Sequence, residues 1–558
     1  MKSATRVLGL TASAFLISAA TGGTAVMMSA CGDPDSGGSP SPDGGNATDS
    51  ASDVGDGSTA VDSSTIDTRG ADASHGDSGS RIAWAPCPQH PTFDCATVPV
   101  PLDYDDASLG TTNLAVLRAP AQSPAERVGV LFTNPGGPGA PQYDRFATTP
   151  ANAAQVLLAG DNDLLYQRFD IIALDWRGVG ASKPAITCFS PTILSSLLAA
   201  PIIPTTDAQW TTLFDAANAV PPSCTSQTDP KLLARVDTAS AAKDMDRVRD
   251  LLGEDKINYL GYSYGTYLGA MYATLFPTRV RGFVLDSPFT QDTDRRDRWL
   301  ATAAALEDSL VQFFAWCAGA ASCTFGPATG RTTDSVASAY DALTAKLDAT
   351  PLTTPTVPLD GSAIKLAVGQ LLYAPTIQYA QLGAALAAAE GGNGTSLRQI
   401  ADHVIAPNDA PSLSLASGFL GISEIDYPLP SGFTDADLRT FLETQVAPIA
   451  PRVGYANAIQ ELSVFVGWPI ALAHAFPKIS AKTAPPLLIT ATQHDPATPY
   501  AQAAKLQTDL GNGSHLLTYA GVGHAQSTFS PCLAVRAALF LLDPSTPPDL
   551  TACPQVPF

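Results

Sequence analysis

Short apolar runs alternate with segments of helical periodicity in the first half of the globular part of the chain. Val128–Thr133, Phe169–Leu174 and Ile257–Leu260 are continuous apolar runs, as expected of strands buried on both faces, and Gly282–Leu285 is a shorter one. Ala239–Leu252 places its apolar residues at helical spacing. Strands and helices that alternate at these lengths predict an α/β fold, with a mostly parallel central sheet and helices on both faces.

The pattern changes near residue 290. From there to about residue 483 the chain is rich in alanine and leucine, and proline- and glycine-rich loops separate helical segments such as Trp299–Ala318 and Tyr379–Ala389. Two further apolar runs, Pro486–Thr490 and His515–Tyr519, then restart the sheet. Because a helical block stands between strands of one sheet, we predict that it forms an inserted cap over the active site.

The N-terminus has the order of a targeting segment. Lys2 and Arg6 precede an apolar stretch from Val7 to Ala20, and small residues lead to Met28-Ser29-Ala30-Cys31. This order is similar to a bacterial lipoprotein signal, with Cys31 as the lipidated first residue of the mature chain. Ordinary secretion with cleavage nearby, or an uncleaved anchor, are the alternatives. In each case we expect an exported protein, held in the bacterial cell envelope or secreted.

The segment that follows the signal has a composition unlike that of a folded domain. It is rich in glycine, serine, aspartate and proline and nearly devoid of large apolar side chains, so it cannot bury enough surface to fold. We expect a flexible tether. The predicted organisation is therefore a signal at 1–30, a tether at 31–80, a core in two parts at 81–289 and 484–558, and a helical cap at 290–483.

The overall charge excludes some function classes. The chain of 558 residues carries a net charge of −21, and ten aspartates with one arginine in residues 32–80 contribute −9 of it. The remainder is an acidic, soluble surface, which argues against a nucleic-acid partner. We expect contact with a membrane only through the N-terminal lipid anchor.

Eight cysteines remain besides Cys31. An even number in an exported protein predicts a disulfide framework, although the sequence does not fix its connectivity. A metal site is disfavoured because the chain has no CxxC motif and no Cys/His cluster, and we expect no cofactor. Pairing of sequence neighbours is the favoured connectivity: Cys87 with Cys95, Cys188 with Cys224, Cys317 with Cys323, and Cys532 with Cys553.

One stretch carries a candidate nucleophile. Ser263 stands two residues from Gly261 and from Gly265, between the apolar run Ile257–Leu260 and a helical pattern that reaches about Phe276. A nucleophile at such a turn needs a strained backbone that exposes its hydroxyl, and side chains at 261 and 265 would collide with the neighbouring strand and helix. An ordinary Gly/Ser turn is the alternative, but the strand before and the helix after favour a nucleophile elbow.

A base and an acid follow the last two predicted strands. Serine is a poor nucleophile at its own pKa, so a base must accept its proton and a carboxylate must orient that base. Asp495 comes just after Pro486–Thr490, and His524 ends a Gly-Val-Gly-His turn after His515–Tyr519. The order Ser263, Asp495, His524 is the one that an α/β-hydrolase requires. Asp286 also ends a strand and is the rival acid, although its position favours support of a loop.

A glycine-rich loop completes the candidate site. Asn134–Gly139 reads NPGGPG and follows the strand Val128–Thr133 directly. In an α/β-hydrolase the loop after this strand supplies one amide of the oxyanion hole, and the residue after the nucleophile supplies the other. Gly137 and Tyr264 are the candidate donors. A simple turn of glycines and prolines is the alternative for this loop.

Together these motifs resemble the tripeptidyl-aminopeptidase-like branch of the α/β-hydrolases, whose relatives are the proline iminopeptidases. The resemblance covers about residues 81–558 and rests on NPGGPG, DWRGVGAS, INYLGYSYGTYLG, and DPATPY followed by GVGH. It implies an α/β-hydrolase fold and an exported serine exopeptidase that acts on peptides or small acyl substrates, with Ser263 as nucleophile, Asp495 as orienting acid and His524 as base. An esterase or lipase-like hydrolase, or an inactive surface binding protein, are the alternatives.

The cap departs from the family pattern and contains candidate specificity residues. Cysteines expected near Ile422–Asp426 and before Trp468 are absent, with Glu424 and Phe465 around those places, so one cap disulfide is lost. An aminopeptidase must bind a cationic N-terminus, which carboxylates in the cap can do. Glu424 and Asp426 are therefore candidates for that role; solvent-facing acids are the alternative.

Overall fold

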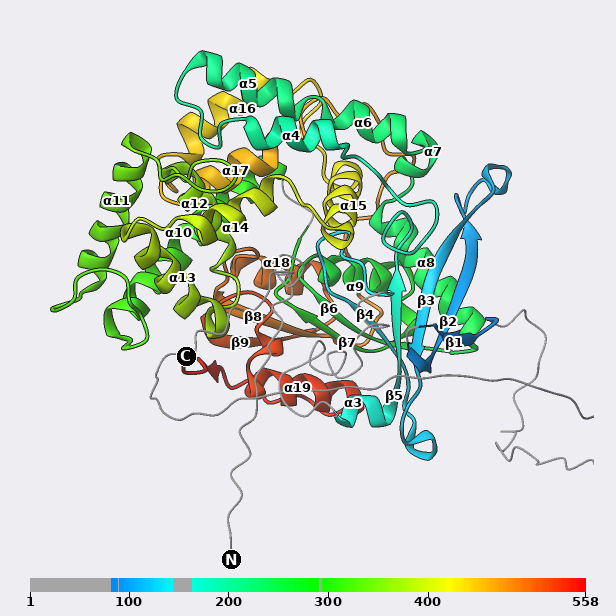
Figure 1. Ribbon diagram of the computed structural model, residues 1–558. Coiled ribbons are helices and arrows are strands. Elements are labelled where there is room, and N and C mark those ends of the chain that lie inside the picture. Colours follow the sequence, from blue (N-terminus) through cyan, green and yellow to red (C-terminus); the bar gives the residue numbers. More distant parts are fainter. Residues whose placement is uncertain (1–81, 89, 144–162, 291–293) are drawn as a thin grey trace, which may run out of the picture. The chain divides into compact units, whose positions relative to one another are not determined.

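The computed structural model describes residues 82–558 except 89, 144–162 and 291–293 (Figure 1). The predicted signal, the tether and the lipidated Cys31 lie outside these residues. Within the described part of the chain, none of the helices has both the length and the apolar character needed to cross a membrane.

A ten-stranded sheet forms the centre, in the order β1-β2-β3-β5-β4-β6-β7-β8-β9-β10. The first three strands and β5 pair antiparallel, and all pairs from β5–β4 onward are parallel. The predicted mostly parallel sheet is thus confirmed. The strands are β1 (Ala85–Cys87), β2 (His90–Pro101), β3 (Thr111–Ala119), β4 (Gly129–Asn134), β5 (Phe169–Asp175), β6 (Ile257–Tyr262), β7 (Val280–Asp286), β8 (Leu488–His494), β9 (His515–Val522) and β10 (Cys553–Pro554).

Helices cover both faces of the sheet, as predicted (Figure 1). Successive strand residues point to opposite faces, so Leu131 and Leu260 pack in the cluster with α19, and Phe132 and Tyr259 pack in the cluster with α8 and α9. This double burial explains why the strands read as continuous apolar runs. The covering helices are α3 (Asp163–Arg168), α8 (Thr238–Leu252), α9 (Tyr264–Leu275), α18 (Ala501–Leu510) and α19 (Pro531–Leu542), with 3-10 turns at Ala107–Leu109, Pro124–Glu126, Pro277–Arg279 and Gln526–Thr528.

The helices between β7 and β8 form a layer above the sheet (Figure 1). Asp or Thr residues cap the N-termini of α10, α11, α12, α15 and α16 by accepting a hydrogen bond from a first-turn backbone N–H. The helices are α10 (Arg295–Gly319), α11 (Thr333–Ala349), α12 (Gly361–Gln370), α13 (Pro375–Glu390), α14 (Thr395–Ile405), α15 (Ala410–Asp426), α16 (Asp435–Phe441), the π-helical turn η4 (Leu442–Val446) and α17 (Gly454–Ser463).

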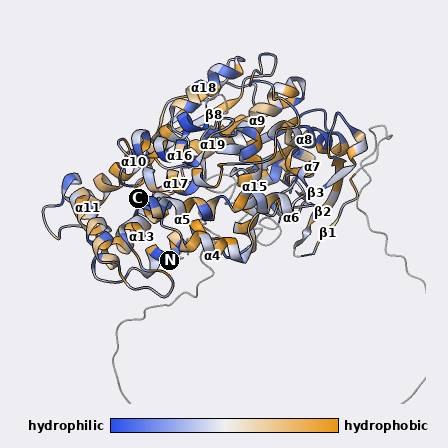
Figure 2. Cartoon of the chain, turned by 90° about the horizontal axis from the view of Figure 1, so that it is seen from above, coloured by the Kyte–Doolittle hydropathy of each residue, from blue (hydrophilic) through white to orange (hydrophobic). Residues whose placement is uncertain are grey.

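A second stretch of chain joins this helical layer. Four helices follow β5, and three of them pack against this layer, with α4 on α14, α5 on α17 and α7 on α15. From above, α5 lies beside α17 although more than 200 residues separate them in sequence (Figure 2). These helices are α4 (Pro191–Ala199), α5 (Asp207–Ala217), α6 (Val220–Gln227) and α7 (Pro230–Leu233). The layer over the sheet therefore comes from two insertions, one after β5 and one after β7.

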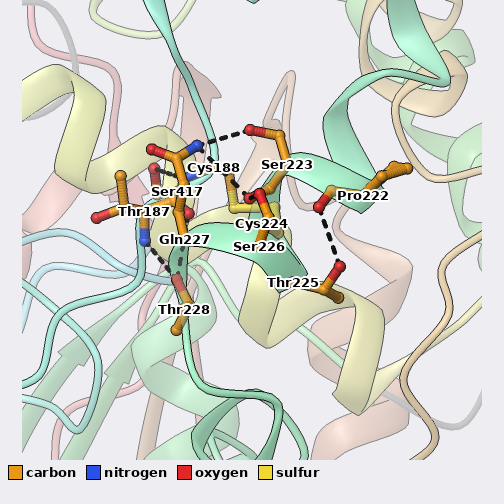
Figure 3. Close-up of a disulfide and its surroundings, with 10 residues drawn as sticks. All are labelled: Thr187, Cys188, Pro222, Ser223, Cys224, Thr225, Ser226, Gln227, Thr228 and Ser417. Atoms are coloured by element: carbon orange, nitrogen blue, oxygen red, sulfur yellow. Dashed lines mark hydrogen bonds between the residues drawn. A yellow bond between two sulfur atoms is a disulfide. The ribbon is translucent and has the colours of Figure 1, made fainter.

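All four disulfides form between sequence neighbours, which confirms the favoured pairing: Cys87–Cys95, Cys188–Cys224, Cys317–Cys323 and Cys532–Cys553. The second one ties the loop after β5 to α6 (Figure 3). Beside it, the amide of Cys188 donates to the hydroxyl of Ser417 on α15 (3.3 Å), and the amide of Thr187 donates to the hydroxyl of Thr228 (2.9 Å). The disulfide therefore closes the first insertion on itself, and the hydrogen bond from Cys188 to Ser417 links that insertion to the second.

The loop after β5 has a structural role. The Asp175 carboxylate accepts hydrogen bonds from the backbone amides of Gln142 and Ala181, at 2.5 and 2.8 Å. Arg177 does not pair with Asp175 but with Asp244 on α8, and the guanidinium Nη2 lies 2.6 Å from Oδ1 with both side chains fully buried. These contacts fix the loop beside the glycine-rich segment after β4.

Candidate active site

Ser263 occupies the sharp turn between β6 and α9. Its φ is 55° and its ψ is −125°, a region that non-glycine residues rarely adopt. A Cβ on Gly261 would lie 2.6 Å from the Gly265 carbonyl oxygen, and a Cβ on Gly265 would lie 2.7 Å from the Asn134 carbonyl oxygen. The steric reason for the two glycines is therefore as predicted, and the neighbour of Gly265 is the glycine-rich loop.

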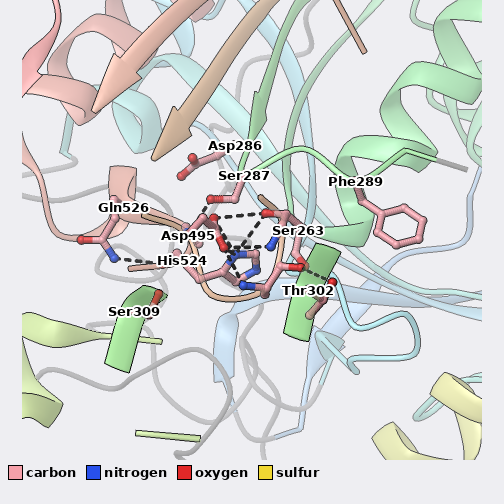
Figure 4. Close-up of polar contacts among 12 residues, drawn as sticks. Ser263, Asp286, Ser287, Phe289, Thr302, Ser309, Asp495, His524 and Gln526 are labelled. Carbon is pink, nitrogen blue, oxygen red and sulfur yellow. Dashed lines mark hydrogen bonds and ion pairs between the residues drawn. The ribbon is translucent and has the colours of Figure 1, made fainter. Parts of the chain in front are cut away.

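His524 and Asp495 come together from the turns after β9 and β8. Nδ1 of His524 lies 2.9 and 3.0 Å from the two carboxylate oxygens of Asp495. The amides of Ala497 and Thr498 each donate to the same carboxylate at 2.9 Å, which fixes its orientation. On the other side of the ring, Nε2 of His524 is buried and has no hydrogen-bond partner among the described residues. Ser263 lies beside this imidazole (Figure 4).

The electrostatics of His524 suit a base. Burial alone would lower the pKa of the imidazole, because it disfavours the charged form. The charge and hydrogen bond of Asp495, with a contribution from the charge of Asp286, offset this effect and raise the pKa above its ordinary value. An imidazole in this setting accepts a proton at Nε2 more readily than a free one.

The glycine-rich loop lies against the elbow. A Cβ on Gly136 would lie 2.9 Å from the Cβ of Ser263, so only glycine allows this approach. The amide of Gly136 donates to Oδ1 of Asn134 at 2.7 Å and is therefore already used. Gly137 supplies the next amide along the loop. A Cβ on Gly137 would lie 3.3 Å from Cδ1 of Leu415, which belongs to α15 in the cap. Its role as an oxyanion donor, with Tyr264, stays a prediction.

A second network links the elbow to the histidine turn. The backbone oxygen of Asp286 accepts from the amide of Ser263 at 2.9 Å. Its carboxylate accepts from the hydroxyl of Thr490 at 2.8 Å and from the amide and hydroxyl of Ser527 at 3.0 and 2.5 Å. Next to it, the Ser287 hydroxyl accepts from the amide of Ala525 at 2.8 Å. The rival acid therefore supports loops, as its position suggested.

The same network holds an unusual backbone. Among the described residues, three that are not glycine have positive φ: Ser263 (55°), Ser287 (56°) and Ala525 (54°). One is the candidate nucleophile, one follows Asp286 and one follows His524. Backbone strain of this kind persists only where the surroundings hold it in place. The sequence alone did not reveal the roles of Ser287 and Ser527, because only the order of the strands in the sheet brings these two residues together.

Asp426 and Glu424 are both buried at the end of α15. The Asp426 carboxylate accepts from the amide and hydroxyl of Thr238, at 2.9 and 2.5 Å, and lies 3.4 Å from the Tyr264 hydroxyl. It thus joins the cap to α8 and α9. Oε1 of Glu424 has no hydrogen-bond partner among the described residues and lies 3.6 Å from Nη1 of Arg295. Burial raises the pKa of both carboxyl groups to about 7.

The site of the missing cap disulfide is filled by an arginine. Arg295 at the start of α10 pairs with Glu424, and its guanidinium carbon lies 3.6 Å from the centroid of the Phe465 ring. It also donates to the backbone oxygens of Ser423 and Tyr427, at 2.6 and 2.7 Å. A buried cation therefore links the two segments in which the cysteines were expected.

One face of α10 lies against the acid turn. The Thr302 hydroxyl donates to the backbone oxygen of Ala497 at 3.3 Å, and the Ser309 hydroxyl donates to that of His494 at 3.4 Å (Figure 4). Seven residues separate the two, so they share one face of the helix. Trp299 on the preceding turn donates from Nε1 to Glu461 at 2.8 Å. The N-terminal half of α10 is therefore part of the wall of the site, which the sequence pattern did not reveal.

One group among the described residues has the spacing of a metal site: Asp103, Asp105 and His474. Asp103 already accepts from Nε of Arg235 at 2.7 Å and contacts Nε2 of His474 at 2.8 Å. A guanidinium against the central carboxylate disfavours a cation there. These hydrogen bonds hold the pKa of Asp103 well below its usual range, although burial opposes them.

Comparison with known proteins agrees with this geometry. A family described as the alpha/beta hydrolase fold matches residues 136–531. The chain is 29% identical over 496 residues to serine protease Hip1 of Mycobacterium tuberculosis, covering 85% of this chain and 91% of that one. It is 31% identical over 473 residues to carboxylesterase B of the same organism (83% and 86% covered), and 28% identical over 481 residues to tripeptidyl aminopeptidase of Streptomyces lividans (83% and 84%).

The fold, the site and the family match define the class. The chain belongs to the α/β-hydrolase family. It is an enzyme of the serine-hydrolase type, and its resemblance to the tripeptidyl-aminopeptidase-like branch is confirmed by its relatives.

Proposed function

We propose that this protein is an exported serine aminopeptidase that releases short N-terminal peptides or single residues through an acyl-enzyme on Ser263. The observation that carries the proposal is Nε2 of His524, which has no hydrogen-bond partner within the described ranges and lies beside Ser263 while Asp495 holds Nδ1. A base oriented on one side and open on the other is what proton abstraction from a serine requires.

The proposed course follows from the positions of these groups. Oγ of Ser263 attacks the scissile carbonyl carbon while its proton moves to Nε2 of His524. Asp495 holds the Nδ1–H tautomer and stabilises the imidazolium. The backbone amides of Gly137 and Tyr264 donate to the oxyanion. Collapse passes the proton from His524 to the leaving amine, and a water activated by His524 then hydrolyses the acyl-enzyme and regenerates the free serine.

Two relatives support peptides as substrates, since one is named a serine protease and one a tripeptidyl aminopeptidase. An esterase is the second candidate, because a relative of similar identity is named a carboxylesterase. Both activities use the same acyl transfer. We further propose export, with Cys31 as a lipid anchor; this rests on the N-terminal sequence alone and is tested by whether the full chain partitions with membranes.

A labelling experiment and a substrate panel test the function. A fluorophosphonate should label the protein, since it reacts with activated serines. Free-amine tripeptide, proline and alanine anilides should be hydrolysed in preference to short acyl esters if the protein is an aminopeptidase. Ester turnover without anilide turnover would favour the esterase instead. A protein that takes up no label and turns over neither substrate would contradict both enzymes and leave the binding protein.

Glu424 is the better candidate of the two cap acids for the substrate N-terminus. Asp426 is fully engaged by Thr238 and Tyr264, whereas Oε1 of Glu424 has no hydrogen-bond partner in the described structure. We expect Glu424→Gln to raise KM roughly tenfold or more for free-amine anilides, the value of one hydrogen bond to a charge. N-acetylated anilides should change little. Equal effects on both substrates would assign Glu424 to the Arg295 ion pair alone.

The pH profile should report on His524. The base must be neutral, so kcat/KM should fall as the pH decreases through the pKa of His524, and that pKa lies above its ordinary value of about 6.5. Asp495→Asn should move this acid limb to lower pH, because burial then acts without the carboxylate, and should also lower the plateau. An N-blocked ester isolates the effect from the ionisation of Glu424. An acid limb that stays in place in Asp495→Asn would contradict the assignment.

A further inference from the structure

Arg298 is a buried cation that has no hydrogen-bonded or ion-paired partner in the described part of the chain. Its side chain lies on α10 with a relative exposure of 7%, and Nη1 is buried without a hydrogen-bond partner. Within the described ranges it makes no hydrogen bond and no ion pair. Its contacts are aromatic, since the guanidinium carbon lies 4.0 Å from the centroid of Tyr427 and 4.8 Å from that of Phe289.

The neighbouring charges are already committed to other groups. Asp294 pairs with Arg296, and Glu461 accepts from Nε1 of Trp299. Burial also raises the pKa of Glu461 to about 7, so this carboxyl group is not a full counter-charge at neutral pH. Burial lowers the pKa of Arg298 to about 10, which still leaves it charged. An unpaired buried charge is strongly unfavourable, so a ligand that pairs with it would gain correspondingly.

Arg298 reaches the nucleophile through a short chain of contacts. The amide of Phe289 donates to the hydroxyl of Thr266 at 2.8 Å, and that hydroxyl donates to the backbone oxygen of Ser263 at 2.6 Å. The Phe289 ring packs against Tyr264, with centroids 6.3 Å apart. Figure 4 shows Phe289 on the side of Ser263 away from His524. The guanidinium of Arg298 therefore lies behind the Phe289 ring, and this ring borders the side of Ser263 on which the acyl part of a substrate would lie.

We propose that Arg298 binds a carboxylate in the acyl part of the substrate, such as a glutamate or aspartate side chain of the peptide that is released. This inference rests on the proposed acyl transfer at Ser263. Guanidinium and carboxylate match each other in geometry and charge, and they pair most strongly where water is excluded. The aromatic rings of Tyr427 and Phe289 hold the guanidinium plane without satisfying its donors, which leaves Nη1 for the ligand.

Matched substrates test the proposal. Tripeptide anilides carrying glutamate at the first, second or third position are compared with those carrying glutamine, which keeps the size and removes the charge. At one position wild type should prefer glutamate by roughly 10- to 100-fold in kcat/KM, the range of a hydrogen bond to a charged group. Arg298→Gln should abolish this preference, and Arg298→Lys should restore part of it. Arg296→Gln is the control, because Arg296 is two residues away, partly exposed and paired with Asp294.

Thermal unfolding separates a binding role from a structural one. If Arg298 serves a ligand, Arg298→Gln should unfold at the same temperature as wild type or a higher one, since it removes an unpaired buried charge. Anilides turned over without a glutamate preference would overturn the proposal. A lower unfolding temperature of Arg298→Gln, together with equal losses of kcat/KM on the glutamate and glutamine substrates, would also overturn it. Failure to cleave any anilide would instead contradict the aminopeptidase. The role of Arg298 would then be tested with two ester substrates, the p-nitrophenyl monoester of glutaric acid and that of its half-amide, which differ only in the charge of the acyl group.

Discussion

Replacement of Ser263 by alanine is expected to lower kcat/KM by a factor on the order of 10⁴ or more and to abolish fluorophosphonate labelling. The alanine removes the only atom that forms the acyl-enzyme, while Asp495, His524 and the surrounding loops keep their hydrogen bonds. Initial rates on an anilide and on an ester, together with gel-based labelling, measure the effect. Both substrates should lose activity equally, because both reactions pass through the same serine.

Ser196→Ala is a suitable control, since Ser196 is exposed on α4 and hydrogen-bonded only within that helix. It should retain both rate and label. The unfolding temperature of Ser263→Ala should stay close to that of wild type, so a loss of activity is not a loss of fold. Persistent labelling of Ser263→Ala would show that another residue is the nucleophile and would remove the basis of the proposed function.

Asp286→Ala is expected to reduce kcat/KM by roughly two orders of magnitude, the effect of a small displacement of catalytic groups. The change leaves the amide and hydroxyl of Ser527 and the hydroxyl of Thr490 without their acceptor in a fully buried position. It should also lower the free energy of unfolding by about 3 kcal/mol or more, since each of the three unsatisfied buried donors costs about 1–3 kcal/mol. Kinetics and chemical denaturation measure the two effects.

The asparagine variant distinguishes support from catalysis. Asp286→Asn retains an oxygen that can accept from Ser527, so it should recover most of the stability and part of the rate. The Ser263 amide keeps its bond to the backbone oxygen of residue 286 in either variant. Asp543→Asn, at an exposed position, is the matched control. If Asp286 were the acid that orients His524, Asp286→Asn would be as damaging as Asp495→Asn, and this outcome would refute the supporting role.

Much of the site was predictable because its parts are local in sequence. Gly261 and Gly265, on either side of Ser263, are required by the tight junction between strand and helix. In the structure a Cβ at either position would collide with neighbouring atoms. Asp495 and His524 each follow a strand, and strands of a parallel sheet end at the same edge. Their order along the chain therefore predicts their proximity. The disulfides were predictable for a similar reason, since all four close short loops between sequence neighbours.

Other features depend on pairings that no local pattern encodes. The insertion after β5 joins the cap only because α4, α5 and α7 find partners there, more than 150 residues further along the chain. Glu424 and Asp426 both looked like candidate ligand-binding acids, yet one meets Arg295 and the other meets Thr238. The difference arises from packing, since residues two apart on a helix point in different directions.

The sequence by itself determined the fold class, the three residues of the proposed triad and the glycine-rich loop, and it favoured the disulfide pairing that the structure shows. Periodicity and turn chemistry act over a few residues and so leave a trace in the linear chain. Only the tertiary structure decided that Asp286, Ser287 and Ser527 hold the elbow against the histidine turn. It also decided that Arg298 is buried beside the site without a hydrogen-bond partner among the residues that the structure describes. Burial and pairing of charge depend on every element that packs around a group, and those elements come from distant parts of the chain.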